Sequence, residues 1–99
     1  MVNGKTVTVI VPSFNEEENI ENTVKNILIA INNYFDDYEI LLFDDGSTDK
    51  TGEIIDKLAA GNLNVKAIHN SVNCGFGYSY NKGVELASMD YISVLPGDN

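Results

Sequence analysis

The sequence has few basic side chains. Six Lys and Arg residues stand against fifteen Asp and Glu residues, which gives a formal net charge of −9 at pH 7. Proteins that bind nucleic acid or an anionic membrane through a basic patch need the opposite balance, so both classes are disfavoured. A phosphorylated small molecule remains compatible with this charge if a divalent cation lies between the protein and the phosphates.

Cysteine and histidine are each present once. Cys74 is the only cysteine, so no disulfide forms within the chain, and this favours a reducing, cytosolic compartment. His69 is the only histidine, and no cluster of His and Cys exists to make a transition-metal site. We expect Cys74 to be inert, and His69 to lie at a strand end without a catalytic role.

Long apolar runs are also missing. The first mostly apolar segment covers residues 7–11 and ends at Pro12, far short of the ~20 residues that span a bilayer. No secretory signal is visible at the N-terminus. With 43% hydrophobic residues, the 99-residue chain has enough apolar surface for one modest core. We therefore expect residues 1–99 to form a single soluble domain in the cytoplasm.

What the chain does contain is an alternation of strand and helix patterns. Strands are predicted over residues 6–11, 39–43, 65–68 and 91–95. Apolar residues recur at helical spacing between residues 16 and 35, and further helices are predicted before Gly61 and from about residue 77 to 87. A helix between each pair of strands predicts an α/β fold with a doubly wound parallel sheet, four strands and three helices, and helices on both faces.

The composition of each strand predicts its place in this sheet. Residues 39–43 are apolar on both faces and should be central, whereas residues 65–68 are shorter and more polar and should lie near an edge. Ser13 and Glu16 resemble a capping box at the start of the first helix. Asp45 and Ser47 are expected to cap the second helix. Gly75 and Gly77 are expected to allow close packing of a loop against the third helix.

Polar segments follow the first, second and fourth strands, at residues 12–17, 44–47 and 96–99. In a parallel sheet these segments converge on one edge, where ligands bind in folds of this kind. Phe14 offers a ring on which a base can stack, a contact worth about 1–3 kcal/mol. Asp44 can accept a hydrogen bond from a base imide or a ribose hydroxyl. Asp98 is a hard oxygen ligand suited to Mg²⁺ or Mn²⁺.

A purely structural interpretation competes at most of these positions. Glu16 and Glu17 suit the positive end of a helix dipole without any ligand. Asp98 lies in Pro-Gly-Asp-Asn, which is a favourable turn sequence. Asp44 is harder to explain in this way, because it directly follows an apolar strand and is paired with a second carboxylate.

Several segments together resemble the family-2 glycosyltransferases. They are Val9-Ile-Val-Pro-Ser-Phe-Asn-Glu-Glu17, Glu39-Ile-Leu-Leu-Phe-Asp-Asp-Gly-Ser-Thr-Asp-Lys-Thr51, Asn73-x-Gly75, Asn81-Lys-Gly83, and Asp90-Tyr-Ile92 before Pro96-Gly-Asp98. The resemblance covers essentially the whole chain, and its order and spacing are similar to the nucleotide-binding, Rossmann-like half of the GT-A fold. Within the family, the first segment is most similar to polyprenyl-phosphate sugar transferases of the dolichol-phosphate mannosyltransferase type.

The resemblance implies a role for each matching residue. Pro12, Phe14 and Glu16 would line the nucleotide pocket, with Phe14 where the family more often has Tyr. Asp44 and Asp45 would contact the base or ribose, and Gly97 would line the donor site. Asp98 would be the last Asp of the family's Asp-x-Asp motif and hold the Mg²⁺ or Mn²⁺ ion. This sequence has Pro96 at the first position of that motif, so we expect either weaker metal binding or an ion that takes more of its ligands from the diphosphate and water.

The resemblance further implies inverting transfer of a hexose from UDP or GDP to an acceptor hydroxyl or polyprenyl phosphate, as in polysaccharide or cell-wall biosynthesis. The catalytic base and acceptor site would lie beyond Asn99, so residues 1–99 would be the nucleotide-diphospho-sugar-binding part of a catalytic domain and have little activity alone. The full-length form would be cytoplasmic or associated with the cytoplasmic face of a membrane. The alternative is a non-catalytic nucleotide-binding or assembly module, with homo-oligomers forming through the exposed sheet edge.

Overall fold

A computed structural model of the chain describes residues 4–97 and shows alternating strands and helices. All the predicted strands and helices are confirmed as elements. In chain order they are β1 (Thr6–Ser13), α1 (Ile20–Asn32), β2 (Asp37–Asp45), α2 (Thr51–Ala60), β3 (Val65–Asn70), α3 (Phe76–Leu86) and β4 (Tyr91–Val94).

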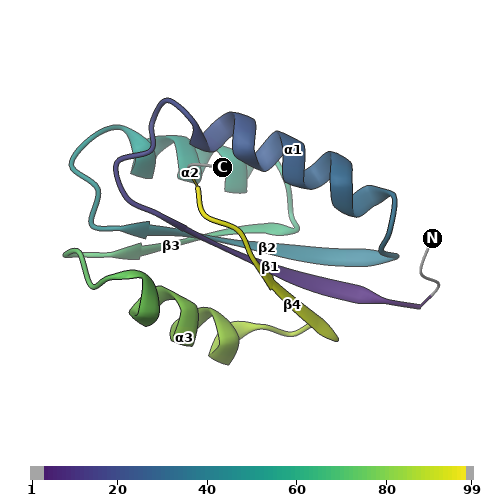
Figure 1. The fold of residues 1–99 in the computed structure, drawn as a ribbon. Helices are drawn as coiled ribbons and strands as arrows, with labels where there is room; N and C mark the ends of the chain where they lie inside the picture. Colours follow the sequence, from purple (N-terminus) through teal and green to yellow (C-terminus); the bar gives the residue numbers. More distant parts are fainter. Residues whose placement is uncertain (1–3, 98–99) are drawn as a thin grey trace.

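The strands form one parallel sheet with the order β3-β2-β1-β4. Helices α1 and α2 cover one face and α3 covers the other (Figure 1). The doubly wound architecture is therefore confirmed. β2 lies between two strands and β3 lies at an edge, as their apolar and polar compositions predicted.

Alternation along the two central strands divides the core between the two faces of the sheet. Val9, Val11 and Leu42 point toward α1 and α2 and pack in the larger cluster with residues such as Ile20 and Ile55. The intervening residues form a smaller cluster on the α3 side, which consists of Ile10, Leu41 and Phe43. Successive side chains in a strand point to opposite faces of the sheet, so neighbouring residues in the sequence pack into different layers.

Gly83 allows α3 to approach the sheet closely. A Cβ atom at this position would lie 2.7 Å from Cδ1 and 2.9 Å from Cγ2 of Ile10, whose side chain is fully buried. A β-branched side chain in a filled core has little freedom to move away. Gly83 therefore supplies a close contact between α3 and β1.

The start of α1 differs from the prediction. The helix begins at Ile20 rather than at residue 16, after a turn in which the Asn19 N–H donates to the Glu16 carbonyl at 3.0 Å. No side-chain capping bond is present at Asn19, and the buried Ser13 hydroxyl has no hydrogen-bond partner. The predicted capping box is wrong because Ser13 is still part of β1, where its side chain is buried. The predicted end of α2 is confirmed, since Gly61 is its C-cap.

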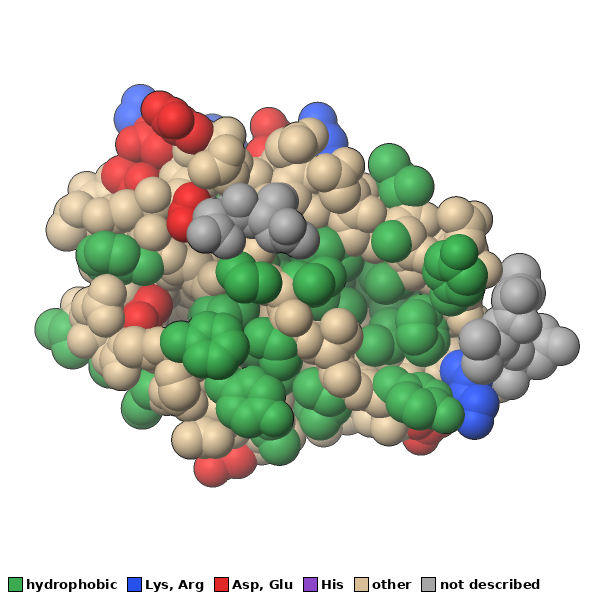
Figure 2. Space-filling model, in the orientation of Figure 1, with side chains coloured by type: hydrophobic (Ala, Val, Ile, Leu, Met, Phe, Trp, Pro, Cys, Tyr) green, Lys and Arg blue, Asp and Glu red, His purple; other side chains and the backbone are tan. Residues whose placement is uncertain are grey.

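Apolar side chains collect where β4 and α3 meet solvent. Figure 2 shows this hydrophobic area in the same orientation as Figure 1. Tyr91 and Ile92 of β4 are exposed, as are Tyr78 and Val84 of α3, and β4 pairs with β1 alone. The exposed edge anticipated from the sequence is therefore present. Among residues 4–97, no helix is long and apolar enough to cross a membrane.

Candidate functional site

The carboxyl ends of the strands bring most of the predicted site residues to one edge. Ser13 of β1 is the register partner of Asp44 in β2, and Asp44 is in turn the partner of His69 in β3. On the other side, the Gly97 N–H donates to the Pro12 carbonyl at 3.0 Å. Pro12, Asp44 and Gly97 are thus on adjacent strand ends, and Phe14 follows one residue after Ser13.

Asp44 is a buried carboxylate with both oxygens held in place. Its residue surface is 8% exposed. Oδ1 accepts the Ser47 N–H at 2.9 Å, and Oδ2 lies 2.9 Å from Nδ1 of His69. Burial alone would raise the pKa of Asp44, but the hydrogen bonds from Ser47 and His69 outweigh it and leave the pKa below its ordinary value. Asp44 is therefore ionised and oriented at neutral pH.

His69 contributes to this site in a way that the sequence did not predict. Its Nε2 lies 2.7 Å from Oδ1 of Asp56 on α2, while Nδ1 contacts Asp44. The hydrogen bond to Asp56, followed by that to Asp44, raises the pKa of the imidazole. One signal was available in the sequence: His69 and Asp44 each directly follow a predicted apolar strand. Only the pairing of β2 with β3 shows that these positions are adjacent.

Asp45 turns to the opposite face of the sheet and holds the loop before α3. Its oxygens accept the N–H groups of Cys74 at 2.8 Å and Gly75 at 2.9 Å, and the Asn70 side-chain amide at 3.0 Å. Burial would raise the pKa of Asp45, but these three hydrogen bonds lower it overall. The expectation that Asp45 caps α2 is wrong, because alternation along β2 directs it toward α3.

Two further expectations about local structure are corrected. Ser47 does not cap α2; its hydroxyl accepts the Asn15 N–H at 3.0 Å, and the Thr51 N–H at the start of α2 donates to Asp49 instead. A Cβ at Gly75 or Gly77 would meet nothing within 4 Å, so close packing is not their role. Gly75 has a φ of +90°, a conformation that glycine adopts without steric cost.

The loop after β1 is bound to the loop after β2. Asn15 has a φ of +52°, and its side-chain oxygen accepts the Thr48 N–H at 2.8 Å. The Glu16 N–H donates to the Thr51 hydroxyl at 2.8 Å. These bonds fix the segment that carries Phe14 and Glu16 relative to the start of α2.

Replacing Asn15 with Ala should destabilise the protein by about 1–2 kcal/mol. The Ala variant loses the hydrogen bond to Thr48, and the alanine must still adopt a left-handed backbone conformation without that bond to offset its cost. Urea unfolding gives the free energy. Asn15→Gly is the matched control, since it loses the same side chain but accepts a positive φ, and it should lose less stability than Asn15→Ala. Equal losses in the two variants would contradict this account of the loop.

Phe14 has the exposure that a stacking platform requires. The residue is 43% exposed although it adjoins the buried end of β1. Glu16 is half-buried, and its Oε1 accepts the Asn19 side-chain amide at 3.2 Å. An exposed ring and a fixed, ionised Asp44 at one sheet edge can bind a flat group that carries an N–H donor.

The predicted metal ligand, Asp98, lies outside the described residues. Within residues 4–97, no group of three or more His, Cys, Asp and Glu side chains is arranged to hold a metal ion. Asp44 and Asp45 have their oxygens engaged by donors of the chain itself. A metal ion at either carboxylate would therefore have to share its oxygens with these donors.

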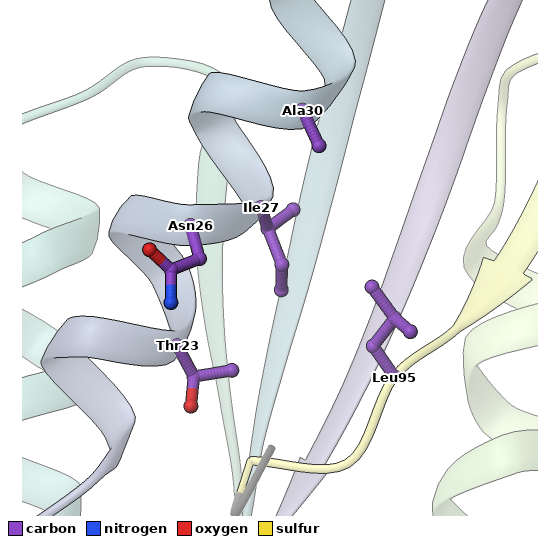
Figure 3. Close-up of a pocket in the computed structure, with 5 residues that line it drawn as sticks. All are labelled: Thr23, Asn26, Ile27, Ala30 and Leu95. Atoms are coloured by element: carbon purple, nitrogen blue, oxygen red, sulfur yellow. The ribbon is translucent and has the colours of Figure 1, made fainter.

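A separate cavity of about 270 Å³ lies between α1 and the segment that follows β4. Figure 3 shows the residues that line it, which are Thr23, Asn26, Ile27, Ala30 and Leu95. None of these side chains is charged or nucleophilic apart from the Thr23 hydroxyl, and that hydroxyl donates to the Gly97 carbonyl at 3.0 Å. The cavity offers apolar volume but no reactive group, so we place the candidate site at the strand ends.

A known protein family matches most of the chain. The model of the family described as "Glycosyl transferase family 2" matches residues 8–99. The chain belongs to glycosyl transferase family 2. The family match includes β1 from residue 8 onward, the other three strands, and the carboxyl edge of the sheet.

A curated relative supports this assignment. Glycosyltransferase GlyG of Streptococcus pneumoniae is 31% identical over 96 residues, which is 97% of this chain and 31% of GlyG. The chain thus spans about a third of the length of GlyG.

Solved structures share the fold. TarS residues 1–349 of S. aureus in complex with UDP superposes with a TM-score of 0.78 at 25% identity, over 94% of this chain and 27% of that one. Glucosyl-3-phosphoglycerate synthase of Mycobacterium tuberculosis, in complex with Mn²⁺, UDP and phosphoglyceric acid, gives a TM-score of 0.70 at 26% identity, over 95% and 33% of the two chains. The α/β fold is therefore GT-A-like.

Proposed function

We propose that this chain is the donor-binding part of a glycosyltransferase and holds a nucleoside-diphosphate sugar at the carboxyl edge of its sheet. The observation that carries the proposal is the buried, ionised carboxylate of Asp44, held by Ser47 and His69 next to the strand end that leads to the exposed Phe14 ring. The carboxylate accepts a hydrogen bond from the base or ribose, and the ring stacks on the base.

The donor in this proposal is a UDP- or GDP-sugar. The complexes of TarS and of the mycobacterial synthase contain UDP, and a mannosyltransferase from Pyrobaculum calidifontis is solved with GDP-Man and Mn²⁺. Pro12, Glu16 and Gly97 line the same edge in our proposal. Asp45 contributes indirectly, by fixing the loop that precedes α3.

Asp98 is the proposed ligand of a Mg²⁺ or Mn²⁺ ion, which would supply charge neutralisation of the leaving diphosphate. The chain spans about a third of GlyG, and the catalytic base and the acceptor site belong, in this proposal, to the part of such proteins that it does not cover. The acceptor would be a saccharide hydroxyl or a polyprenyl phosphate, as in the dolichol-phosphate mannosyltransferase type.

The test is calorimetric titration of UDP and GDP, with and without Mn²⁺. We expect weak binding that Asp44→Ala lowers by about 10- to 100-fold, because a hydrogen bond to a charged group contributes roughly 1.5–3 kcal/mol. Asp37→Asn is the control, since Asp37 is an exposed carboxylate at the opposite end of the same strand. It should leave binding unchanged.

Absence of any nucleotide binding, with or without the metal ion, would overturn this proposal. That result would favour the alternative of an assembly module. The exposed apolar strand β4 and the aromatic side chains of α3 would then be the surface to examine, by measuring the oligomeric state in solution.

A further inference from the structure

We propose that His69 is a positioning residue for the donor nucleotide: its ring, held between Asp56 and Asp44, fixes the Asp44 carboxylate in the orientation that meets the base or ribose. This inference rests on the proposed function, because it concerns the same Asp44 contact. It adds a residue from β3 and another from α2 to a site that the sequence had placed only on the loops after β1, β2 and β4.

The geometry requires a doubly protonated ring. Nδ1 lies 2.9 Å from Oδ2 of Asp44, and Nε2 lies 2.7 Å from Oδ1 of Asp56. Ionised carboxylates only accept hydrogen bonds, so each ring nitrogen must carry a proton to donate. His69 is therefore an imidazolium that joins a buried carboxylate, with an 11% exposed side chain, to one on α2 that is 63% exposed.

The first turn of α2 packs closely against the Asp44 carboxylate and the His69 ring. A Cβ atom at Gly52, in the first turn of α2, would lie 2.7 Å from Oδ2 of Asp44 and 3.5 Å from Cε1 of His69. The helix backbone therefore closes over the ion pair. With Ser47 holding the other oxygen, the carboxylate is fixed at both ends, and this reduces the ordering that a ligand must impose when it binds.

The charged groups that face the ring are Asp44 from β2 and Asp56 from α2. Asp45 of β2 points to the other face, and Lys66 of the same strand as His69 pairs with Glu39 at 3.3 Å. No cation competes for either carboxylate oxygen that His69 contacts in the described residues.

Nucleotide binding should consequently depend on pH. The hydrogen bonds to Asp56 and then to Asp44 raise the pKa of His69, so the imidazolium is complete below the ordinary value near 6.5 and is lost as the pH rises through the raised value. Loss of one ring proton leaves a nitrogen lone pair against a carboxylate. A neutral ring donates to only one of the two carboxylates, so Asp44 loses one of its two restraints in the molecules whose Nδ1 is unprotonated.

The first experiment follows the single histidine of the chain by NMR, in which its imidazole signals are unambiguous. Asp56→Asn should lower the His69 pKa by about one unit, because it removes a facing charge. Glu53→Gln is the control, because Glu53 is an exposed carboxylate on the same helix. This variant should leave the pKa of His69 close to its value in the unchanged protein. UDP or GDP should raise the His69 pKa. If protonation of His69 strengthens nucleotide binding, then bound nucleotide must strengthen protonation of His69 by the same factor.

The second experiment measures UDP and GDP affinity between pH 6 and 8, where the base keeps its N–H. We expect the affinity of the unchanged chain to fall roughly 3- to 10-fold with rising pH, as expected for the weakening of one hydrogen bond. His69→Ala should bind weakly throughout. His69→Asn keeps a donor near the position of Nδ1 but cannot titrate, so it should bind nearly as well as the unchanged chain at pH 6 and show no pH dependence.

The results separate the two proposals. If the unchanged chain binds nucleotide and Asp44→Ala weakens it, but His69→Ala keeps the affinity and pH profile of the unchanged chain, the role of His69 is overturned and the proposed function stands. Absence of nucleotide binding by the unchanged chain overturns both. Circular dichroism of each variant confirms that it is folded before its affinity is compared.

Discussion

Replacing Gly46 with Ala is expected to lower the free energy of unfolding by about 2–5 kcal/mol. Gly46 has a φ of +72°, and a Cβ atom there would lie 2.5 Å from both the Asn73 nitrogen and the Val72 carbonyl carbon. The left-handed conformation costs roughly 1–2 kcal/mol for a residue with a side chain, and the clash with rigid backbone adds roughly 1–3 kcal/mol. Urea unfolding monitored by circular dichroism measures the change.

Gly77→Ala is the matched control for this prediction. A Cβ at Gly77 meets nothing within 4 Å, and the residue lies in the first turn of α3 without a positive φ, so the variant should equal or slightly exceed the original in stability. Gly46→Asn separates the two causes, because Asn tolerates a positive φ but still introduces the Cβ clash. If Gly46→Ala unfolds at the same urea concentration as Gly77→Ala, the close approach of the two loops is not a constraint on this position.

Replacing Glu39 with Ala is expected to cost about 3 kcal/mol at pH 7. This carboxylate is 3% exposed, and its Oε2 accepts the Thr8 hydroxyl at 2.6 Å, the Ser88 N–H at 2.7 Å and the Ser88 hydroxyl at 2.9 Å. Removing it leaves the fully buried Thr8 hydroxyl and the Ser88 N–H without their acceptor, and each such loss costs roughly 1–3 kcal/mol. Chemical denaturation at pH 7 tests the value.

The pH dependence of this effect provides a second measurement. Burial would raise the pKa of Glu39, but the hydrogen bonds from Thr8 and Ser88 outweigh it and lower the pKa. A lowered pKa means that Glu39 stabilises the fold above about pH 4.3, its ordinary value, and that this stability is lost as the pH falls through the lowered value. The difference between the original protein and Glu39→Ala should therefore shrink in acid.

Glu85→Ala serves as the control for Glu39, because Glu85 is an exposed carboxylate on α3. It should change the stability by less than about 0.5 kcal/mol at pH 7. A difference between Glu39→Ala and the original protein that stays constant from pH 7 to pH 3 would show that the charge of Glu39 makes no contribution.

The elements of the fold were predictable because the signals for them are local. Apolar runs ending at Pro12 and at Asp44 mark β1 and β2, and the helical spacing from Ile20 to Ile31 marks α1. The start of α1 was misplaced because Glu16, Glu17 and Glu18 favour a helix N-terminus by charge. The structure instead uses the backbone of this segment to bind the loop after β2.

The candidate site was predictable in part for the same reason. Asp44 is the end of an apolar strand in a parallel sheet, and that position alone brings it to the ligand-binding edge. Its neighbour Asp45 was misassigned because a strand alternates faces. The choice between α2 and α3 as its partner depends on which helix covers which face.

Local patterns in the amino-acid sequence were thus sufficient for the strands, the helices, the parallel sheet and the edge that carries Asp44 and Phe14. The partners of those residues depend on strand register and helix packing, which join positions far apart in the chain. His69 meets Asp44 across 25 residues and Asp56 across 13, and Gly46 meets Val72 and Asn73. Such contacts form only when the whole sheet has assembled, so the tertiary structure alone determines how the Asp44 carboxylate is held.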